Sequence, residues 1–202
     1  MTAIEEAVAA IRAGGLAVVP TDTVYGLACT PYWQAPGRAL AELKGRPPDQ
    51  PVALVAASID VLFECVPELQ GRSGVVARAL LPAPYTLVFP NPARRFAWLT
   101  GSRSDTIGVR VPDVVGSGRE LLDRVGALAA TSANRHGEAD PCRLEEVSQE
   151  LLAAVAAAVD GGELPGIPST VLDLTGPEPR VLREGAVPSA DALAQVRAAL
   201  DG

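Results

Sequence analysis

Residues 51–89, PVALVAASIDVLFECVPELQGRSGVVARALLPAPYTLVF, contain two short apolar runs separated by two amphipathic segments. The first run, PVALVA, has the length and composition of a buried strand, and so does YTLVF at the end of the stretch. Ser58 is suited to cap a helix that continues to about residue 65, and the apolar spacing predicts a second helix over 72–80. Strands and helices that alternate in this way favour an α/β fold.

The same alternation continues on both sides of this stretch. The sequence predicts further helices over 3–13, 37–43, 118–125, 144–158 and from Ser189 to residue 200, of which 144–158 has the clearest helical pattern. It predicts further strands at LAVVPTDTVYGLAC, which is expected to run out into a loop at Pro20, and at TIGVRV, ALAAT, STVLDL and RVLRE. Segments 90–105 and 174–180 join neighbouring strands without a helix, which indicates a mixed sheet. No repeat or linker interrupts the pattern, so residues 1–202 are expected to form a single domain.

The composition is typical of a globular chain that folds without a disulfide or a structural metal. It has 202 residues, 48% hydrophobic and 20% charged, and a chain of this size buries roughly 70% of its unfolded surface. The three cysteines show no CxxC spacing, so reduced thiols and a cytoplasmic location are expected. Glu5 and Glu6 stand where a signal peptide would be basic, and the longest apolar run, 151–159, is too short to span a membrane.

The net charge of −7 disfavours a long phosphate backbone as a partner, because such a ligand would be repelled on average. The arginines are scattered along the chain and indicate no strongly segregated basic face, which extensive binding of DNA or of an RNA such as tRNA would need. A small anion can still be held by a few cations that converge in a cleft.

Several widespread catalytic motifs are absent from the sequence. There is no GxxxxGK[ST] segment and no strand-linked GxGxxG, the two commonest phosphate-binding loops. His136 is the only histidine, which excludes a histidine-rich metal site, and no GxSxG segment supports a Ser-His-Asp triad. The simplest interpretation of His136 is a solvent-exposed loop residue.

Polar side chains instead gather near the ends of predicted strands, where open α/β sheets bind their ligands. In TIGVRVP, Thr106, Gly108 and Arg110 share one face of the strand, while the alternate residues are all apolar. An arginine and a threonine on either side of a glycine resemble one wall of an anion site. A strand with one solvated face accounts for the same pattern.

Three other strand ends carry polar groups of this kind. PTDTVYG places Thr21 and Thr23 on one face of the strand and Asp22 on the opposite face. TSAN carries Ser132 and Asn134 on one side, which an ordinary Ser or Asn turn also explains. Elsewhere, Ser169 begins a strand and Arg183 ends another.

Lys44 is the only lysine, whereas sixteen residues are arginine. Arg46 follows two positions later, in KGRP. A lysine offers a compact charge on a flexible stem and an arginine offers a planar fork, so this pair could serve two different phosphate contacts.

Six segments, PTDTVYGL, KGRP, TIGVRVP, TSAN, PSTVLDL and VLREGAV, resemble in order and spacing the YrdC family, the threonylcarbamoyl-AMP synthases. The resemblance covers about residues 5 to 187, and it is specific because six separate segments match. It implies the YrdC/RibB-like α/β fold, in which a twisted mixed sheet flanked by helices surrounds a large open cleft. Longer members carry a second C-terminal domain, and this chain is expected to be the short form.

The resemblance also implies a reaction. The family makes L-threonylcarbamoyladenylate and pyrophosphate from ATP, L-threonine and bicarbonate, for the t6A modification of tRNA. The Lys-x-Arg and Ser-x-Asn motifs place Lys44, Arg46, Ser132 and Asn134 at ATP and the departing pyrophosphate, with Lys44 and Arg46 as the catalytic pair. Mg²⁺ is expected to bind mostly through ATP and water, because the sequence offers no dedicated carboxylate cage.

The remaining site residues follow from the same resemblance. It implies contacts to the nucleotide for Thr106 and Arg183. It implies contacts to threonine for Thr23, Arg110, Ala130 and Ser169, with Arg110 as the partner of the substrate carboxylate. The product is expected to be handed to a tRNA threonylcarbamoyltransferase.

Some positions depart from the family pattern. LPAP at 81–84 replaces the usual WPGP, and His136-Gly137 replaces Ser-Gly. Asp140 stands near a position that often carries a small hydroxyl, so no nucleotide contact is assigned there. Val55 replaces a histidine found near the threonine in some members.

A paralogous branch with weak or no threonylcarbamoyl-AMP synthesis is disfavoured by the intact Lys-x-Arg and Ser-x-Asn pairs. Two further alternatives remain open from the sequence. One is a related YrdC-like enzyme that forms carbamoyladenylate for another acceptor, although such proteins carry zinc-finger or acylphosphatase segments that are absent here. The other is an RNA-binding module, which the acidic net charge and the few aromatic residues disfavour.

Overall fold

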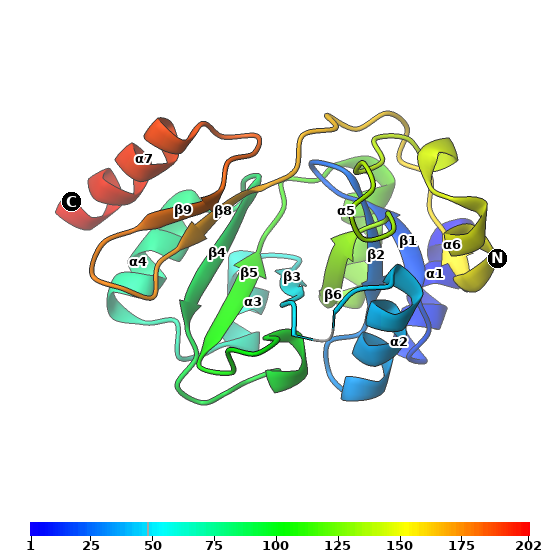
Figure 1. Ribbon diagram of the computed structural model, residues 1–202, viewed down its shortest axis with the longest axis horizontal. Coiled ribbons are helices and arrows are strands. Elements are labelled where there is room, and N and C mark those ends of the chain that lie inside the picture. The colour runs from blue at the N-terminus through cyan, green and yellow to red at the C-terminus, as the bar shows by residue number, and fades with distance from the viewer. Residues whose placement is uncertain (48) are drawn as a thin grey trace.

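A computed structural model describes residues 1–47 and 49–202 and shows a twisted mixed sheet flanked by helices (Figure 1). The strands are β1 (Ala17–Pro20), β2 (Tyr25–Cys29), β3 (Ala53–Ala56), β4 (Tyr85–Pro90), β5 (Thr106–Arg110), β6 (Ala127–Ser132), β7 (Ala157–Ala158), β8 (Thr170–Asp173) and β9 (Arg180–Arg183). The α-helices are α1 (Ala3–Arg12), α2 (Gln34–Lys44), α3 (Ile59–Cys65), α4 (Gly71–Leu80), α5 (Gly116–Val125), α6 (Gln149–Ala154) and α7 (Ser189–Asp201), and the 3₁₀ turns are η1 (Ala97–Leu99) and η2 (Leu144–Glu146). The α/β class and the helix-flanked mixed sheet expected from the sequence are confirmed.

The strands follow the order β7-β1-β2-β6-β3-β5-β4-β8-β9 in a single sheet. The pairs β3–β5 and β4–β8 are parallel, whereas β4–β5 and β8–β9 are antiparallel. The antiparallel pairs are the ones joined by segments 90–105 and 174–180, so the prediction of a mixed sheet from those connections is confirmed.

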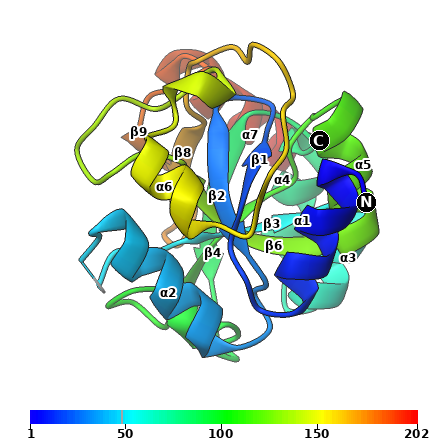
Figure 2. The same cartoon turned by 90° about the vertical axis from the view of Figure 1, so that its right-hand side faces the viewer.

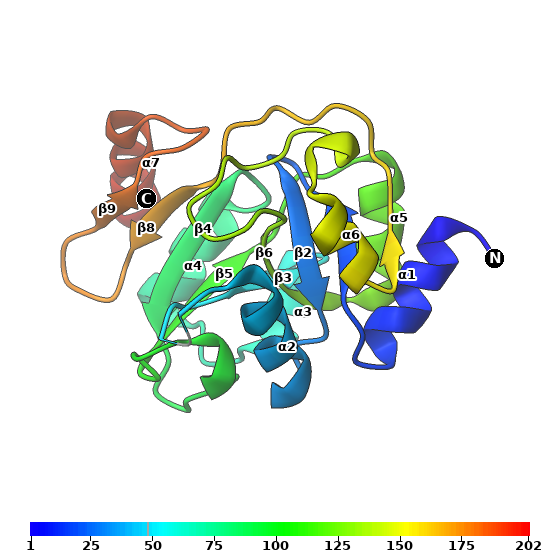
Figure 3. The ribbon, with the colours of Figure 1, turned by 45° about the vertical axis from the view of Figure 1, so that its right-hand side comes forward.

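Helices cover both faces of the sheet. Figure 2 shows α1 and α5 on one face of β1 and β2, with α2 and α6 on the other. Ile11 of α1 and Leu121 of α5 belong to one buried apolar cluster, and Leu40 of α2 belongs to a second, larger one. At the far end of the sheet, α4 packs against α7 beside β8 and β9 (Figure 3). No helix in residues 1–47 and 49–202 is long and apolar enough to cross a membrane.

The helix ends follow from local chemistry. Thr2 and Glu5 form a capping box at the start of α1, and Ser58 caps α3 as predicted. Gly45 ends α2 in the left-handed conformation, with φ of 64°, which glycine adopts without a steric cost. This turn separates Lys44 from Arg46 and sets the direction of both side chains.

Two predictions of secondary structure were wrong. The segment LAVVPTDTVYGLAC is not one strand running into a loop, because β1 and β2 form an antiparallel hairpin through residues 21–24. The long helix expected over 144–158 is divided into η2, α6 and β7. Ser148 caps α6, and the backbone of Ala157–Ala158 pairs in parallel with β1, so a long-range strand pairing replaces the locally favourable helix.

Candidate active site

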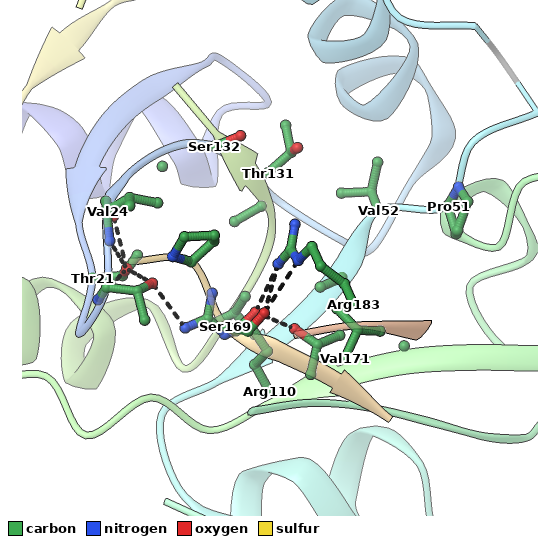
Figure 4. Close-up of a pocket in the computed structure, with 18 of the residues that line it drawn as sticks. Thr21, Val24, Pro51, Val52, Arg110, Thr131, Ser132, Ser169, Val171 and Arg183 are labelled. Atoms are coloured by element: carbon green, nitrogen blue, oxygen red, sulfur yellow. Dashed lines mark hydrogen bonds between the residues drawn. The ribbon is translucent and has the colours of Figure 1, made fainter. Parts of the chain in front are cut away.

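A pocket of about 280 Å³ lies on one face of the central strands (Figure 4). Its floor contains small residues from four strands, namely Gly26, Ala53, Gly108 and Ala130. On β5, Thr106, Gly108 and Arg110 line the pocket, and the intervening Ile107 and Val109 are buried in the core. The alternation predicted for this strand is therefore confirmed, and its polar face lines a pocket.

The first end of the pocket contains the Lys-x-Arg and Ser-x-Asn motifs. The Lys44 ammonium donates to the Ser132 carbonyl and to Asn134 Oδ1, each at 2.6 Å, and to Ser132 Oγ at 3.2 Å. Arg46 donates from NH1 to Thr131 Oγ1 at 2.9 Å and from NH2 to the Pro51 carbonyl. The motifs meet because β6 ends where α2 ends, although nearly ninety residues separate Lys44 from Ser132. Arg46 and Ser132 line the pocket, whereas Lys44 and Asn134 are buried behind Ser132.

The ammonium of Lys44 is held in a charged form at an energetic cost. Burial, and after it the charge of Arg46, lowers the pKa of Lys44 to about 8, although Asp140 and Glu138 act in the opposite direction. Burial also lowers the pKa of Arg46. An anion bound beside these two cations would reverse this effect, so the geometry favours binding of a negatively charged ligand.

Arg110 lies at the second end of the pocket. Its NH2 group donates to Asp22 Oδ1 at 2.6 Å and to Thr23 Oγ1 at 3.2 Å. The other carboxylate oxygen of Asp22 accepts from the backbone N–H of Asp113 at 3.2 Å. Asp22 therefore does not face away from Thr23, as the strand periodicity predicted, because the hairpin turn brings both side chains to Arg110.

Burial lowers the pKa of Arg110, and the positive charge of Arg183 acts in the same direction, while Asp22 opposes both. Arg183 donates to the Ser169 carbonyl at 2.8 Å and to Ser169 Oγ at 3.2 Å. Ser169 Oγ also lies 2.8 Å from Thr86 Oγ1. Figure 4 shows the dashed lines that join Arg183 to Ser169. Gly185 lets the backbone that follows Arg183 lie close to the backbone of Pro168 and Ser169, because a Cβ at Gly185 would lie 2.2 Å from the Pro168 carbonyl oxygen.

Three buried side-chain donors have no acceptor in the part of the chain that the structure describes, namely Nε of Arg46, Arg110 and Arg119. Arg119 does not line the pocket, whereas Arg46 and Arg110 line it at its two ends. Buried polar groups in folded proteins are nearly always hydrogen-bonded, so an unpaired donor on an arginine that lines a pocket favours a ligand site there. The pocket thus offers a donor for an anion at each end.

The structure places the predicted site residues in two sets. Eight of them line the pocket, namely Thr23, Arg46, Thr106, Arg110, Ala130, Ser132, Ser169 and Arg183. Lys44 and Asn134 contact the pocket through Ser132. The ten residues are therefore brought together, while their roles toward ligands remain predictions.

Sequence reasoning missed four residues of this site. Asp22, Thr86, Thr131 and Asp140 had no assigned role, yet three of them line the pocket and Asp22 binds Arg110. Thr131 is the first residue of TSAN, so the motif that pointed to Ser132 and Asn134 could also have pointed to Thr131. His136 is exposed, as expected.

The described residues contain no group of three or more His, Cys, Asp or Glu side chains that could hold a metal ion. Asp140 is the one acidic residue among the described residues that line the pocket. A divalent cation there would need most of its ligands from a substrate and water.

Comparison with known proteins identifies the family. The family model Sua5_yciO_yrdC, described as telomere recombination, matches residues 9–185. The chain therefore belongs to the Sua5/YciO/YrdC family.

Named relatives agree with this assignment. The chain is 35% identical to the threonylcarbamoyl-AMP synthase of Pyrococcus abyssi, over 88% of this chain and 52% of that protein. It is 35% identical to the threonylcarbamoyl-AMP synthase of Xanthomonas axonopodis pv. citri, over 78% of this chain and 85% of that one. The crystal structure of P. abyssi Sua5 complexed with L-threonine superimposes with a TM-score of 0.86 at 32% identity, and covers 95% of this chain and 56% of that one. The chain thus spans about half of the Pyrococcus protein and most of the Xanthomonas protein.

Proposed function

We propose that the chain is a threonylcarbamoyl-AMP synthase, a nucleotidyltransferase that makes L-threonylcarbamoyladenylate and pyrophosphate from L-threonine, bicarbonate and ATP. The observation that carries this proposal is the pocket itself, in which cations from distant segments lie at two ends of one hollow. Two relatives named for this activity and a neighbour solved with L-threonine support it.

In the proposed reaction the threonine amine first takes up CO₂ or bicarbonate to form a carbamate. A carbamate oxygen then attacks the α-phosphorus of ATP, a new P–O bond forms, and the bond to the departing pyrophosphate breaks. No protein nucleophile is needed. The protein must hold two anionic reactants in line, and such positioning supplies roughly 7–11 kcal/mol in favourable cases.

The roles of the residues follow from the two ends of the pocket. Lys44 and Arg46 would neutralise the charge that grows on the pyrophosphate, with Ser132 and Asn134 fixing the ammonium. Thr106 and Arg183 are assigned to the nucleotide. Thr23, Arg110, Ala130 and Ser169 are assigned to threonine, with Arg110 facing the carboxylate.

Mg²⁺ fits this pocket as a companion of ATP and not as a resident ion. Asp140 would be the contact from the protein, because it lines the pocket and its charge acts on Lys44. The ion, when bound, would reduce the repulsion between the triphosphate and the carbamate.

The cellular setting follows from the same proposal. The chain would act as a single domain in the cytoplasm, with its three free cysteines reduced, and pass its adenylate to a tRNA threonylcarbamoyltransferase. Direct tRNA binding would be weak, because the net charge is −7.

The decisive experiment incubates the protein with ATP, Mg²⁺ and bicarbonate, with each amino acid in turn, and measures pyrophosphate and the adenylate. Threonine-dependent formation of both supports the proposal. In a separate incubation without threonine, pyrophosphate formed from ATP and carbamoyl phosphate would instead identify the carbamoyladenylate-forming alternative. Absence of both products would overturn the proposed function.

A further inference from the structure

A cluster of aromatic rings lies outside the pocket, formed by Tyr32, Phe96 and Trp98. The ring centroids of Tyr32 and Phe96 are 6.3 Å apart, and those of Phe96 and Trp98 are 6.0 Å apart. Tyr32 is 54% exposed and Trp98 is 37% exposed. We call these three residues the aromatic surface. Grouped, exposed rings of this size mark interaction sites more often than isolated apolar residues do.

The aromatic surface is held rigidly from below. Asn91, which is almost fully buried, accepts from the backbone N–H of Arg95 and donates to its carbonyl, both at 2.9 Å. Trp98 Nε1 donates to the Pro31 carbonyl at 3.0 Å, which fixes η1 beside the start of α2. Phe96 has a φ of 49°, a left-handed conformation that costs about 1–3 kcal/mol in a residue other than glycine. These contacts hold the loop that carries Phe96 and Trp98 against the start of α2.

The same loop forms part of the pocket rim. The backbone N–H of Val52 donates to the Leu99 carbonyl at 2.7 Å, and Thr100 lines the pocket together with Val52. Figure 3 shows the green segment that contains residues 97–99 beside α2. A protein bound to the aromatic surface would therefore lie next to the mouth of the pocket.

The two loops that carry these rings are basic, and the acidic residue whose charge acts on Tyr32, Glu64, comes from α3. Segments 31–38 and 91–104 contain four arginines and no acidic residue, although the net charge is −7. Arg95 is paired with Glu68 at 2.6 Å, and Arg103 lies 3.8 Å from Asp105. Arg38 and Arg94 form no ion pair with any residue of 1–47 or 49–202. Two uncompensated cations beside exposed rings are complementary to an acidic partner.

We propose that the aromatic surface, with Arg38 and Arg94, docks an acidic surface of the protein that consumes the adenylate. This inference rests on the proposed function. The product would be a mixed anhydride of a carbamate and a phosphate, which water hydrolyses, so a consumer bound at the pocket mouth would shorten its exposure to solvent. Trp, Tyr and Arg are also the residues most enriched at energetic centres of protein interfaces.

A single-stranded nucleic acid fits this surface less well. Stacking of bases needs free ring faces, whereas the rings here pack on one another at interplanar angles of 52° and 77°. Two free arginines are also few, because tight backbone binding uses about six to ten phosphate contacts.

The two tryptophans of the chain provide a direct test. Trp98 belongs to the aromatic surface, whereas Trp33 is 43% exposed and its ring lies near Gly14 and not among the three rings. The wild-type protein would be labelled with 5-fluorotryptophan and titrated with the purified cognate tRNA threonylcarbamoyltransferase. We expect the ¹⁹F resonance of Trp98 to shift or broaden while that of Trp33 changes little, with Trp33→Phe and Trp98→Phe variants giving the assignments.

Activity measurements complete the test. Trp98→Ala and the charge reversal Arg94→Glu should leave threonine-dependent pyrophosphate release unchanged, because neither residue lines the pocket. Both should lower the coupled formation of t6A on tRNA by about tenfold or more at limiting protein, the size expected for loss of an interface centre. Trp33→Ala is the matched control and should leave coupled transfer unchanged.

Other results would overturn the inference. Unchanged coupled transfer in both variants would do so, as would a wild-type dimer that Trp98→Ala converts to a monomer, since the occupant would then be a second copy. A Trp98 shift on adding tRNA alone, lost steeply between 50 and 200 mM salt, would assign the surface to RNA. A wild-type protein that makes no adenylate would instead refute the proposed function, a failure that the pyrophosphate assay detects separately.

Discussion

The two ends of the pocket hold their cations in different ways. At one end, Lys44 donates to a carbonyl, a hydroxyl and an amide oxygen, all of them neutral. At the other end, Arg110 is bound to the carboxylate of Asp22. Among the described residues, no carboxylate is in direct contact with Lys44, whereas the charge of Arg110 is partly compensated and its guanidinium is fixed in place.

This difference fits the two substrates of the proposed reaction. A triphosphate carries several negative charges that increase on the leaving group, and it needs cations that no protein anion has neutralised. An amino-acid carboxylate carries one charge, and its recognition depends more on geometry than on net field. Single substitutions should therefore have different consequences at the two ends.

The largest effect is expected from Lys44→Ala. Removing the ammonium takes away a buried cation next to the proposed phosphate site and should reduce the rate of threonine-dependent pyrophosphate release by about 10²–10³-fold or more. Lys44→Arg is the matched control, since it keeps the charge but replaces the compact head, and it should restore only part of the rate. Normal turnover in Lys44→Ala would refute the role of this residue.

Arg110→Ala should come next and act on the other substrate. Loss of the guanidinium should raise the KM for threonine by about tenfold to a hundredfold, because one charge-assisted contact is removed, with the KM for ATP nearly unchanged. Initial rates measured over a range of threonine at saturating ATP test this. A threonine response equal to that of the wild type would place the carboxylate site elsewhere.

Asp22→Asn should produce a weaker version of the same change. Asparagine can still accept the N–H of Asp113, so the hairpin turn is retained, but the buried Arg110 loses its counter-charge and its fixed position. The KM for threonine should rise by about tenfold, and Asp22→Glu should restore part of it. Asp113→Asn removes an exposed charge nearby and is the control. Equal KM values in Asp22→Asn and wild type would mean that Arg110 needs no partner.

The sequence predicted these two ends unequally. The faces of β5 were predictable because strict alternation of apolar and polar residues survives in the sheet, and the meeting of Lys44 with Ser132 and Asn134 was expected from the family motifs. The bond between Asp22 and Arg110 was not predicted. Strand periodicity placed Asp22 opposite Thr23, but the chain turns at 21–24, and a turn has no period of two.

The region 144–158 shows the same limit on local patterns. The spacing of its apolar residues is that of a helix, yet the backbone of Ala157–Ala158 pairs with β1, which lies far away in the sequence. The aromatic surface could not be predicted from the sequence either, because Tyr32 and Phe96 are brought together only by the fold. Contacts between segments that are distant in the sequence determine these features, and such contacts are difficult to predict from the local pattern of a single sequence.

A pH effect would sharpen the contrast between the ends. The pKa of Lys44 is lowered from 10.5 to about 8 on folding, so burial of the charged ammonium opposes folding below pH 8, and this penalty disappears as the pH rises toward 10.5. The stability of Lys44→Met relative to the wild type should therefore be higher at pH 7 than at pH 10. Denaturant unfolding of both proteins at the two pH values measures it. A constant difference would contradict the lowered pKa.

The smallest expected effect concerns the carboxylate at the Lys44 end. Asp140 lines the pocket, unlike Asp22, so its charge should repel free ATP but favour ATP that carries Mg²⁺. Asp140→Asn should therefore tighten binding of ATP in the presence of a chelator and weaken binding of Mg²⁺-ATP, each by about fivefold, as expected for roughly 1 kcal/mol between partly screened charges. Calorimetric titrations with and without Mg²⁺ would measure both values.

Glu138→Gln is the matched control, because Glu138 also acts on the pKa of Lys44 but is not among the residues that line the pocket. This substitution should shift the affinities for free ATP and for Mg²⁺-ATP in the same direction. If Asp140→Asn changed the affinities for free ATP and for Mg²⁺-ATP in the same direction, the carboxylate of Asp140 would not contact the metal ion. The Lys44 end would then bind its anion through cations of the protein alone.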